Sequence, residues 1–227
     1  MISVLLAAYR GEKFIAGQIA SILPQLEAGD ELLVGDDSPA GHAATRDAVL
    51  AFGDPRIHYT QGPRRGVIKN VEFLLGQARG DILVLSDQDD VWLPGKLARA
   101  RALLDTAKPA LLAHGAAITD EALHETGEIQ GTKPGLWRNM IRNGYTGCCM
   151  AFTRQLLPYI LPFPDGIPMH DQWIGLRAER FGTVRVIEEA YILHRRHAGT
   201  QTGQGSTVRQ KVQWRWDMAR ALLRGQR

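Results

Sequence analysis

The stretch GDILVLSDQDDVW, residues 80–92, decides the fold. Its apolar run, Ile82–Leu85, is short and bounded by turn residues, which predicts a buried strand. Acidic side chains follow where this strand ends, and the carboxyl ends of strands are the edge at which open α/β sheets bind ligands. We therefore expect an α/β protein whose functional site is built around Asp87, Asp89 and Asp90.

This acidic cluster indicates a cation. Like charges placed so close together are costly unless a positive group compensates them. Mg²⁺ or Mn²⁺ would do so, because these ions prefer oxygen ligands and usually keep part of their coordination shell for substrate phosphates. The alternative is a solvated acidic turn that caps the next helix. Because the cluster directly follows an apolar strand, the pattern favours a ligand site.

The composition is that of an ordinary globular protein. The chain has 227 residues, of which 44% are hydrophobic and 22% charged. This length suits one large domain, and nothing suggests disorder. The net charge of +3 is too small to indicate a nucleic-acid partner, and none is expected. Arginines do gather from His194 onward, which suggests contact with a diphosphate, a lipid head group or a membrane surface.

The cysteines and the apolar segments indicate the compartment. Cys148 and Cys149 are adjacent, and because neighbouring cysteines seldom bridge each other, we expect two buried thiols in a reducing environment. The segment Ile2–Ala8 lacks a basic flank and is interpreted as the first strand, not as a signal segment. No apolar stretch reaches about eighteen residues, so no membrane span is expected.

The rest of the chain alternates strand and helix patterns, which predicts a mostly parallel sheet flanked by helices. The segment Thr119–Arg142 predicts a long loop with short helical pieces, and Gly144–Phe152 predicts a strand that either passes beneath a ligand or is simply buried. We expect further strands over Ile2–Ala8, Glu31–Gly35, Ile57–Tyr59, Leu111–His114 and, in two pieces, Val184–Leu193, with helices over Glu12–Gln25, Ala43–Phe52, Val67–Ala78, Gly95–Thr106, Leu156–Leu161, Trp173–Phe181 and Val208–Leu223.

Several polar positions allow two interpretations. Asp36 and Asp37 end the second strand, where an acid contacts a base or ribose. Asp37 or Ser38 is alternatively the cap of the next helix, and the two roles can coexist on neighbouring residues. Lys69 lies in the first turn of a helix with Asn70, where a cation opposes the helix dipole and indicates either a ligand or a plain surface side chain. Asp171 starts a later helix, and spacing alone favours an N-cap over a general base.

The carboxyl-terminal part is basic. The run His-Arg-Arg-His, residues 194–197, offers groups that hold a metal or neutralise a diphosphate, or it is a solvated loop. The last helix either lies on an anionic membrane or packs against the domain or a partner subunit. Its expected apolar face and basic flanks are formed by Val212, Trp216, Ala219 and Leu223, and by Arg209, Lys211, Arg215 and Arg220.

Six segments carry a resemblance that spans nearly the whole chain up to about residue 200. They are Ser3–Gly11, Gly35–Ser38, Gly66–Leu74, Ser86–Trp92, His170–Trp173 and Arg196-His197. Together they resemble glycosyltransferase family 2 and its GT-A fold, the nucleotide-diphospho-sugar transferase fold. The forms Asp-Gln-Asp-Asp-Val-Trp, Ile-Lys-Asn and His-Asp-Gln-Trp are most similar to rhamnosyltransferase-type members, which build bacterial surface polysaccharides such as lipopolysaccharide.

The resemblance implies an inverting transfer from a nucleoside-diphosphate sugar. Asp171 would be the general base, and Asp87, Asp89 and His197 would hold Mg²⁺ or Mn²⁺. The nucleotide-sugar would contact Ala8, Tyr9, Arg10, Asp36, Asp37, Lys69, Asn70, Asp87 and Gln88. The acceptor or diphosphate would lie near Asp90, Trp92, Gly147, His170, Gln172, Trp173 and Arg196.

The resemblance also implies partners and boundaries. The donor would be dTDP- or UDP-linked, with L-rhamnose a candidate sugar, and the acceptor would be a glycan or a polyprenyl-linked saccharide. Residues 1–205 would form one GT-A domain, with a nucleotide-sugar-binding half (1–113) and an acceptor half (114–205), followed by a basic amphipathic helix (206–227). The protein would be cytoplasmic, with that helix a candidate for peripheral contact with the inner face of the cell membrane.

Two departures from the family pattern affect the diphosphate side. His194 stands where many relatives have a Tyr, and Ala198–Gly203 replaces an Asn-rich segment. Two alternative functions are a catalytically inactive nucleotide-sugar-binding relative and a sugar nucleotidyltransferase. The second would carry a glycine-rich basic loop after the first strand, where this chain has only Arg10 and Gly11.

Overall fold

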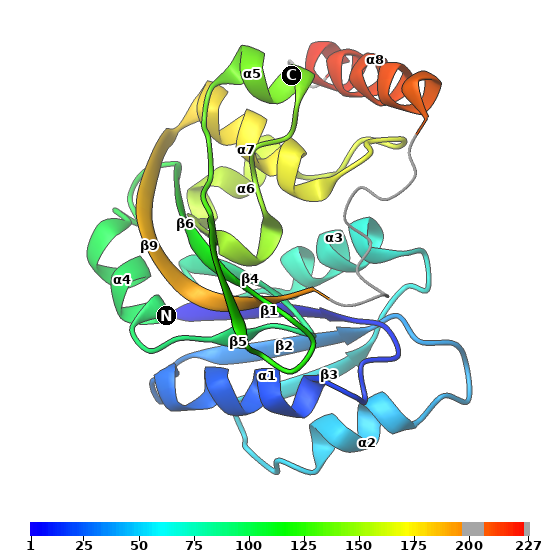
Figure 1. Ribbon diagram of the computed structural model, residues 1–227, viewed down its shortest axis with the longest axis vertical. Helices are drawn as coiled ribbons and strands as arrows, with labels where there is room; N and C mark the ends of the chain where they lie inside the picture. The colour runs from blue at the N-terminus through cyan, green and yellow to red at the C-terminus, as the bar shows by residue number, and fades with distance from the viewer. Residues whose placement is uncertain (197–206, 225–227) are drawn as a thin grey trace.

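The computed structural model describes residues 1–196 and 207–224. Within them, a mixed sheet has the strand order β3-β2-β1-β4-β8-β6-β9-β5, and β7 pairs with β6 outside this path. Helices cover both faces of the sheet (Figure 1). This largely parallel, curled α/β sheet is the predicted fold class. His197, a predicted metal ligand, lies outside the described residues.

The first half of the sheet is parallel and places the acids together. It contains β1 (Ile2–Ala8), β2 (Glu31–Asp36), β3 (Ile57–Gln61) and β4 (Ile82–Asp87). Ala8 lies beside Asp36 of β2, and Ala7 lies beside Asp87 of β4. Because parallel strands end at the same edge, the two predicted acidic tips flank the end of β1.

Side chains of β1 alternate between the two faces of the sheet. Val4 and Leu6 pack in the core on the side of α1 (Ile15–Ile22), whereas Leu5 packs on the side of α3 (Val67–Gln77). A parallel strand covered on both faces is apolar throughout, which is why its sequence reads as a continuous apolar run. The helices that complete the two layers are α2 (Ala44–Leu50) and α4 (Lys96–Leu103) on the first face, and α6 (Leu157–Ile160) and α7 (His170–Phe181) on the second.

The second half of the sheet returns the chain to the acidic edge. The strand β8 (Met150–Thr153) is antiparallel to β4 and to β6 (Ala110–Thr119). The long strand β9 (Thr183–Arg195) runs parallel to β6, and its far end pairs with β5 (Val91–Trp92). Figure 1 shows β9 curving along the molecule toward β5, which brings residues 194 and 195 back to the acidic stretch.

Several predicted elements differ in the structure. The expected loop over 119–142 contains β7 (Glu125–Gln130), an exposed strand held by its pairing with β6, and α5 (Leu136–Ile141). The expected strand from Gly144 begins with a 3₁₀ turn, Gly147–Cys149, before β8. The two pieces expected over 184–193 are one strand, β9.

Two predicted capping roles are wrong. The N-cap of α7 is Met169, so Asp171 lies inside the first turn and does not cap the helix. The helix after β2 begins at Ala44 with Ala43 as N-cap, so Asp37 does not cap it. Both acids are therefore available for other interactions.

The last helix, α8 (Val208–Arg224), has part of its expected apolar face in solvent. Val212 and Trp216 are exposed, whereas Met218, Ala221 and Leu222 are buried against the core. The helix offers two apolar stripes, and contacts with α5 and the body of the protein decide which of them is buried.

Cys148 and Cys149 are buried free thiols, as predicted. In the described part of the chain, no helix combines the length and the apolar character that crossing a bilayer requires.

We predict that Gly80→Ala lowers the free energy of unfolding by about 1–3 kcal/mol, the usual cost of overpacking. A Cβ at this position would lie 2.5 Å from the backbone nitrogen of Ser3, which cannot move without shifting β1. Urea denaturation measures the effect.

Gly17→Ala is the matched control, because Gly17 lies in α1 and a Cβ there meets nothing within 4 Å. We expect it to be neutral or to stabilise by up to about 1 kcal/mol through helix propensity. Equal midpoints for the two variants would contradict the close packing of Gly80 on β1.

Candidate active site

The end of β1 is tied to the acidic stretch by one side chain. Gln88 Oε1 accepts a hydrogen bond from the backbone N–H of Tyr9 at 2.8 Å, and Gln88 Nε2 donates to the Tyr9 carbonyl at 3.0 Å. Gly11 makes room for this contact, because a Cβ there would lie 2.2 Å from Gln88 Oε1. Gln88, predicted to contact the nucleotide, thus uses its amide to hold Tyr9, whose side chain is 52% exposed at the edge of the sheet.

The turn after β1 is fixed from β2 and α2. Arg10 has a left-handed backbone (φ 49°), and its N–H donates to Ser38 Oγ at 2.8 Å. The N–H of Gly11 donates to Thr45 Oγ1 at 2.9 Å. The side chains of Tyr9 and Arg10 consequently point outward from a rigid turn, as groups that contact a base or a phosphate would.

The acids at the end of β2 are bonded within the protein. Asp36 accepts hydrogen bonds from the Tyr59 hydroxyl and the Ser38 N–H, each at 3.0 Å. Burial, together with the hydrogen bond and charge of Asp36, raises the pKa of Tyr59 to about 12. The Asp37 carboxylate accepts from the N–H groups of Arg64 at 2.6 Å and Gly66 at 2.7 Å. Asp37 therefore shapes the basic loop between β3 and α3, residues 62–66. A contact of either acid with a nucleotide stays a prediction.

Lys69 and Asn70 are also bonded within the protein. Lys69 Nζ lies 2.7 Å from Glu72 Oε2 and 3.5 Å from Asp165 Oδ1, and the Glu72 hydrogen bond raises the pKa of Lys69. Asn70 is buried and donates to the Gly35 carbonyl at 2.7 Å, while its Oδ1 is buried without a hydrogen-bond partner in the described structure. The predicted diphosphate contact of Lys69 would require it to leave its two carboxylates.

The acidic cluster lies at the edge of the sheet, with Asp90 buried and Asp87 and Asp89 partly exposed. Asp90 is 1% exposed, and its Oδ1 lies 2.9 Å from His194 Nδ1 at the end of β9. Burial alone lowers the pKa of His194, but the hydrogen bond and charge of Asp90 raise it to about 9, so this histidine is a cation at neutral pH. Burial and the negative charges of Asp90 and Asp89 raise the pKa of Asp87 to about 7.

A buried lysine completes the cluster. Lys96 is 3% exposed, and its Nζ donates to the Cys148 carbonyl at 2.6 Å and lies 4.0 Å from the centre of the Trp92 ring. Burial lowers the pKa of Lys96 to about 8. Lys96 and His194 thus hold the turn Gly147–Cys149 from two sides, since Cys148 Sγ lies 3.8 Å from His194 Nδ1.

Sequence reasoning missed the roles of Lys96 and Cys148, and it named His194 within the basic run 194–197 without its partner Asp90. A signal existed for Lys96, because it is a cation in the first turn of α4, the same criterion that marked Lys69. Arg195 was missed as well. Its Nε donates to the carbonyl of Asp89 at 2.8 Å and helps to fix the acidic stretch.

The donors at this edge fit a divalent cation. Ligand atoms of Asp90, Cys148 and His194 lie within 4.8 Å of one another. A protonated His194 has no lone pair for a metal and pairs with Asp90 instead, so the carboxylates are the donors. Asp90 Oδ2 is buried without a hydrogen-bond partner among the described residues, which is costly unless a cation or a water satisfies it. With Asp87 and Asp89 adjacent, the donor set is rich in the carboxylate oxygens that Mg²⁺ and Mn²⁺ prefer.

Asp171 lies on the other side of the turn Gly147–Cys149. A Cβ at Gly147 would lie 3.8 Å from Asp171 Cβ and 3.0 Å from His170 Nε2. Asp171 Oδ1 accepts from Asn143 Nδ2 at 3.1 Å and from the N–H of Gln172 at 2.7 Å. Desolvation lowers the pKa of His170. One short turn therefore separates the predicted general base from the acidic cluster.

The remaining predicted neighbours lie in the core or in surface contacts. Trp173 is 2% exposed, with its indole N–H donating to the Ile160 carbonyl at 2.9 Å. Gln172 donates to the Asn139 carbonyl of α5, and Trp92 is buried against Lys96. Arg196 pairs with Glu128 at 3.0 Å. In the structure Trp173 and Gln172 act in packing, and substrate contacts for this group stay predictions.

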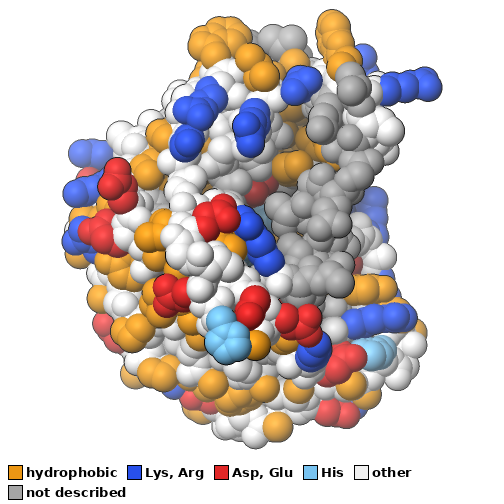
Figure 2. Space-filling view, in the orientation of Figure 1, with side chains coloured by type: hydrophobic (Ala, Val, Ile, Leu, Met, Phe, Trp, Pro, Cys, Tyr) orange, Lys and Arg blue, Asp and Glu red, His pale blue; other side chains and the backbone are white. Residues whose placement is uncertain are grey.

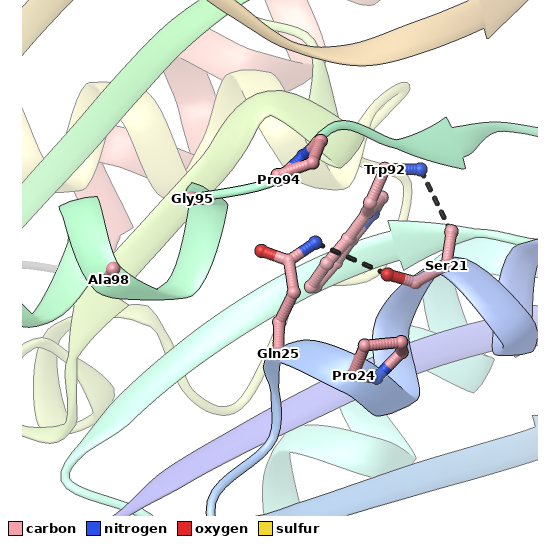
Figure 3. Close-up of a pocket in the computed structure, with 7 residues that line it drawn as sticks. All are labelled: Ser21, Pro24, Gln25, Trp92, Pro94, Gly95 and Ala98. Carbon is pink, nitrogen blue, oxygen red and sulfur yellow. Dashed lines mark hydrogen bonds between the residues drawn. The ribbon is translucent and has the colours of Figure 1, made fainter.

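A pocket next to the acidic cluster is lined by uncharged residues (Figure 3). The backbone N–H of Trp92 donates to Ser21 Oγ at 2.9 Å, and Gln25 Nε2 donates to the Ser21 carbonyl at 3.2 Å. Its lining has no charged side chain, so it lacks groups that bind a diphosphate or a metal. The lining residues are Ser21, Pro24, Gln25, Trp92, Pro94, Gly95 and Ala98.

Comparisons with known proteins bear on the family and the fold of the chain. The model of the family described as glycosyl transferase family 2 matches residues 3–160. A curated relative from Escherichia coli, the UDP-Glc:alpha-D-GlcNAc-diphosphoundecaprenol beta-1,3-glucosyltransferase WfgD, is 24% identical over 222 residues, which cover 96% of this chain and 85% of the relative.

Solved structures share the fold. Staphylococcus aureus TarS 1–349 in complex with UDP-GlcNAc matches with a TM-score of 0.70 and 18% identity, over 91% of this chain and 61% of TarS 1–349. Glucosyl-3-phosphoglycerate synthase from Mycobacterium tuberculosis, in complex with Mn²⁺, UDP-Glc and phosphoglyceric acid, matches with a TM-score of 0.62 and 22% identity, over 96% and 80% of the two chains. The chain therefore spans about three fifths of TarS 1–349, and the expected GT-A type of α/β fold is confirmed.

We predict that His194 makes stability depend on pH in the alkaline range. Its pKa is raised from 6.5 to about 9 in the folded state, so its stabilising effect is complete below about pH 6.5 and is lost as the pH rises through about 9. The advantage of the wild type over His194→Gln in EDTA should therefore shrink, by on the order of 2–3 kcal/mol, between pH 6.5 and 9.5. Urea midpoints across this range measure it.

The comparison of the wild type with His194→Gln removes pH-dependent contributions to stability that both proteins share, such as that of Lys96. His124→Gln, at an exposed histidine before β7, controls for the loss of an imidazole. An advantage that stays constant with pH would contradict the charged His194–Asp90 pair.

Proposed function

The chain belongs to glycosyl transferase family 2, and from this premise we propose that it transfers a sugar from a nucleoside-diphosphate donor to a hydroxyl group of a glycan or lipid-linked saccharide. The observation that carries the proposal is the turn Gly147–Cys149, which has the acidic cluster on one side and Asp171 on the other. Such a transfer needs a site for the leaving diphosphate and a base for the acceptor, close together and on opposite sides of the reacting carbon.

The donor would bind across the end of β1. The exposed side chains of Tyr9 and Arg10 would contact the nucleotide, and Arg64 and Arg65 of the loop held by Asp37 would add positive charge. Residues 1–113 would thus form the donor half and 114–205 the acceptor half. A donor site that is kept without catalysis would instead make the chain an inactive nucleotide-sugar-binding relative.

A divalent cation, when bound, would offset the negative charge that develops on the leaving diphosphate. Asp87 and Asp89 would hold it, with His197 as the third ligand implied by the resemblance. Asp90 and His194 would fix the acidic stretch from below. Mn²⁺ in the synthase complex from Mycobacterium tuberculosis supports this class of ion.

Asp171 would accept the proton of the acceptor hydroxyl. The hydroxyl oxygen then forms a bond to the anomeric carbon while the bond from that carbon to the diphosphate oxygen breaks, which inverts the configuration. Asn143 holds the Asp171 carboxylate in one orientation. The carboxylate lies in the first turn of α7, where the helix dipole favours its ionised form.

The relatives indicate the substrates we propose. The names of WfgD and of the TarS complex specify UDP-linked sugars, which favours UDP over dTDP as the donor nucleotide. L-rhamnose linked to dTDP is the alternative offered by the subgroup resemblance. The name of WfgD specifies a diphosphoundecaprenol-linked acceptor, which supports a lipid-linked acceptor and a peripheral location at the inner membrane face.

We expect one nucleoside diphosphate to stabilise the protein in the presence of a metal. Thermal unfolding is measured with UDP, dTDP, GDP and CDP, each with Mn²⁺, Mg²⁺ or EDTA. A ligand at about a hundredfold excess over its Kd should raise Tm by roughly 5–10 °C, and EDTA should abolish the shift. The absence of a shift for all four nucleotides would argue against the donor site.

Asp89→Asn should remove the metal-dependent part of this Tm shift, because it deletes a carboxylate from the predicted metal site. Asp105→Asn, at an exposed acid after α4, is the matched control and should keep the full shift. Equal shifts in both variants would place the metal elsewhere.

Asp171→Asn should lower the transfer rate by about 10²–10⁴, the usual contribution of a general base. Its nucleotide-dependent Tm shift should stay near that of the wild type, which separates catalysis from binding and folding. Asp105→Asn, whose side chain is 58% exposed, is again the control and should keep nearly full activity. A near-normal rate for Asp171→Asn would assign the base to another residue.

A further inference from the structure

The outer sides of α5 and α8 carry large apolar side chains in solvent. On α5, Trp137 is 81% exposed and Ile141 is 65% exposed. On α8, Trp216 is 66% exposed and Val212 is 44% exposed. In each helix the two side chains are four residues apart, so they lie on the same face. Two exposed tryptophans with apolar neighbours form a patch of the kind that marks an interaction site.

The two helices present one continuous surface, which we call the α5–α8 face. Arg215 Nε of α8 donates to the Ile141 carbonyl at the end of α5, at 2.9 Å. Figure 1 shows the helices next to each other at one end of the molecule. The opposite stripe of α8, with Met218, Ala221 and Leu222, is buried in the core, so the orientation of the exposed stripe is fixed.

The α5–α8 face is also basic. Arg138, Arg142, Arg209 and Arg220 are exposed around the apolar side chains, and Figure 2 shows orange and blue side chains together over this end of the molecule. In the part of the chain that the structure describes, no ion pair involves these arginines. The sequences of the two helices contain one acid, Asp217, which accepts a hydrogen bond from Gln213.

We propose that the α5–α8 face docks onto an anionic lipid bilayer. Tryptophan and isoleucine enter the interfacial region of a membrane, while arginines contact the negatively charged head groups. A second copy of this chain suits the face less well. A two-fold dimer through it would place the same patch on both sides, and arginines would then face arginines.

The face is joined to the acceptor side of the active site. Asn143, two residues after α5, donates to Asp171, and the Asn139 carbonyl within α5 accepts from Gln172. Docking would therefore hold the Asp171 side of the cleft next to the bilayer, where the saccharide of a lipid-linked acceptor lies. This use of the face rests on the proposed function, whereas lipid binding itself does not.

The test is flotation of the purified full chain with vesicles of phosphatidylcholine, with and without phosphatidylglycerol. We expect binding to the anionic vesicles, with a blue shift of tryptophan fluorescence and weakening at high salt. Trp137→Ser combined with Trp216→Ser should lower the partition coefficient at least about tenfold. Arg138→Gln combined with Arg209→Gln should remove most of the preference for phosphatidylglycerol.

Two matched controls lie on α2, away from the face. Leu50→Ser removes an exposed apolar side chain, and Arg46→Gln removes an exposed arginine. Both should bind vesicles like the wild type. The tryptophan variant should keep its nucleotide-dependent Tm shift and its activity on a water-soluble acceptor, so that lipid docking and transfer are judged separately.

Failure of the wild type to bind anionic vesicles overturns the proposal, as does equal binding by the tryptophan variant. Dimerisation without lipid that the tryptophan variant abolishes would also overturn it, because the face would then belong to a second copy. Loss of the nucleotide shift in the wild type, with vesicle binding intact, would count against the proposed function alone.

Discussion

The buried carboxylate of Asp90 constrains the rest of the site. A charge that is 1% exposed needs a partner, and the partner here is His194, which is 104 residues further along the chain. His194 reaches Asp90 because the far end of β9 lies between β6 and β5, and its pairing with β5 brings it next to the acidic stretch. The curl of the sheet that pairs β9 with β5 therefore also brings the positive partner of Asp90 into place.

The need of a buried charge for a partner also fixes the turn Gly147–Cys149. Lys96 has no carboxylate within hydrogen-bonding distance in the described contacts, and its ammonium is satisfied by the Cys148 carbonyl and the face of Trp92. Removing this lysine would release the turn on the side of the acidic cluster, and Gly147 would carry the disturbance to Asp171. Lys96, Cys148 and Gly147 therefore connect the proposed donor and acceptor sides.

The sequence predicted those features that depend on local pattern. The apolar runs of β1 and β4 and the acids after β4 were readable because strand, turn and motif are adjacent in the chain. Lys96 and His194 were not assigned their partners, because a buried polar contact between distant residues leaves no periodic signal. The buried side of α8 could not be predicted, since Trp216 and Met218 both belong to apolar stripes, and only tertiary contacts distinguish them.

These dependencies differ between the two halves of the site. Backbone register sets the proposed donor edge, because Ala8, Asp36 and Asp87 are aligned by strand pairing and cannot shift singly. Side-chain contacts set the proposed acceptor edge, where Asp171 depends on Asn143 and a turn without regular pairing. Side-chain contacts can change without altering a sheet. On the proposed assignment, a new acceptor would therefore require fewer backbone changes than a new donor nucleotide.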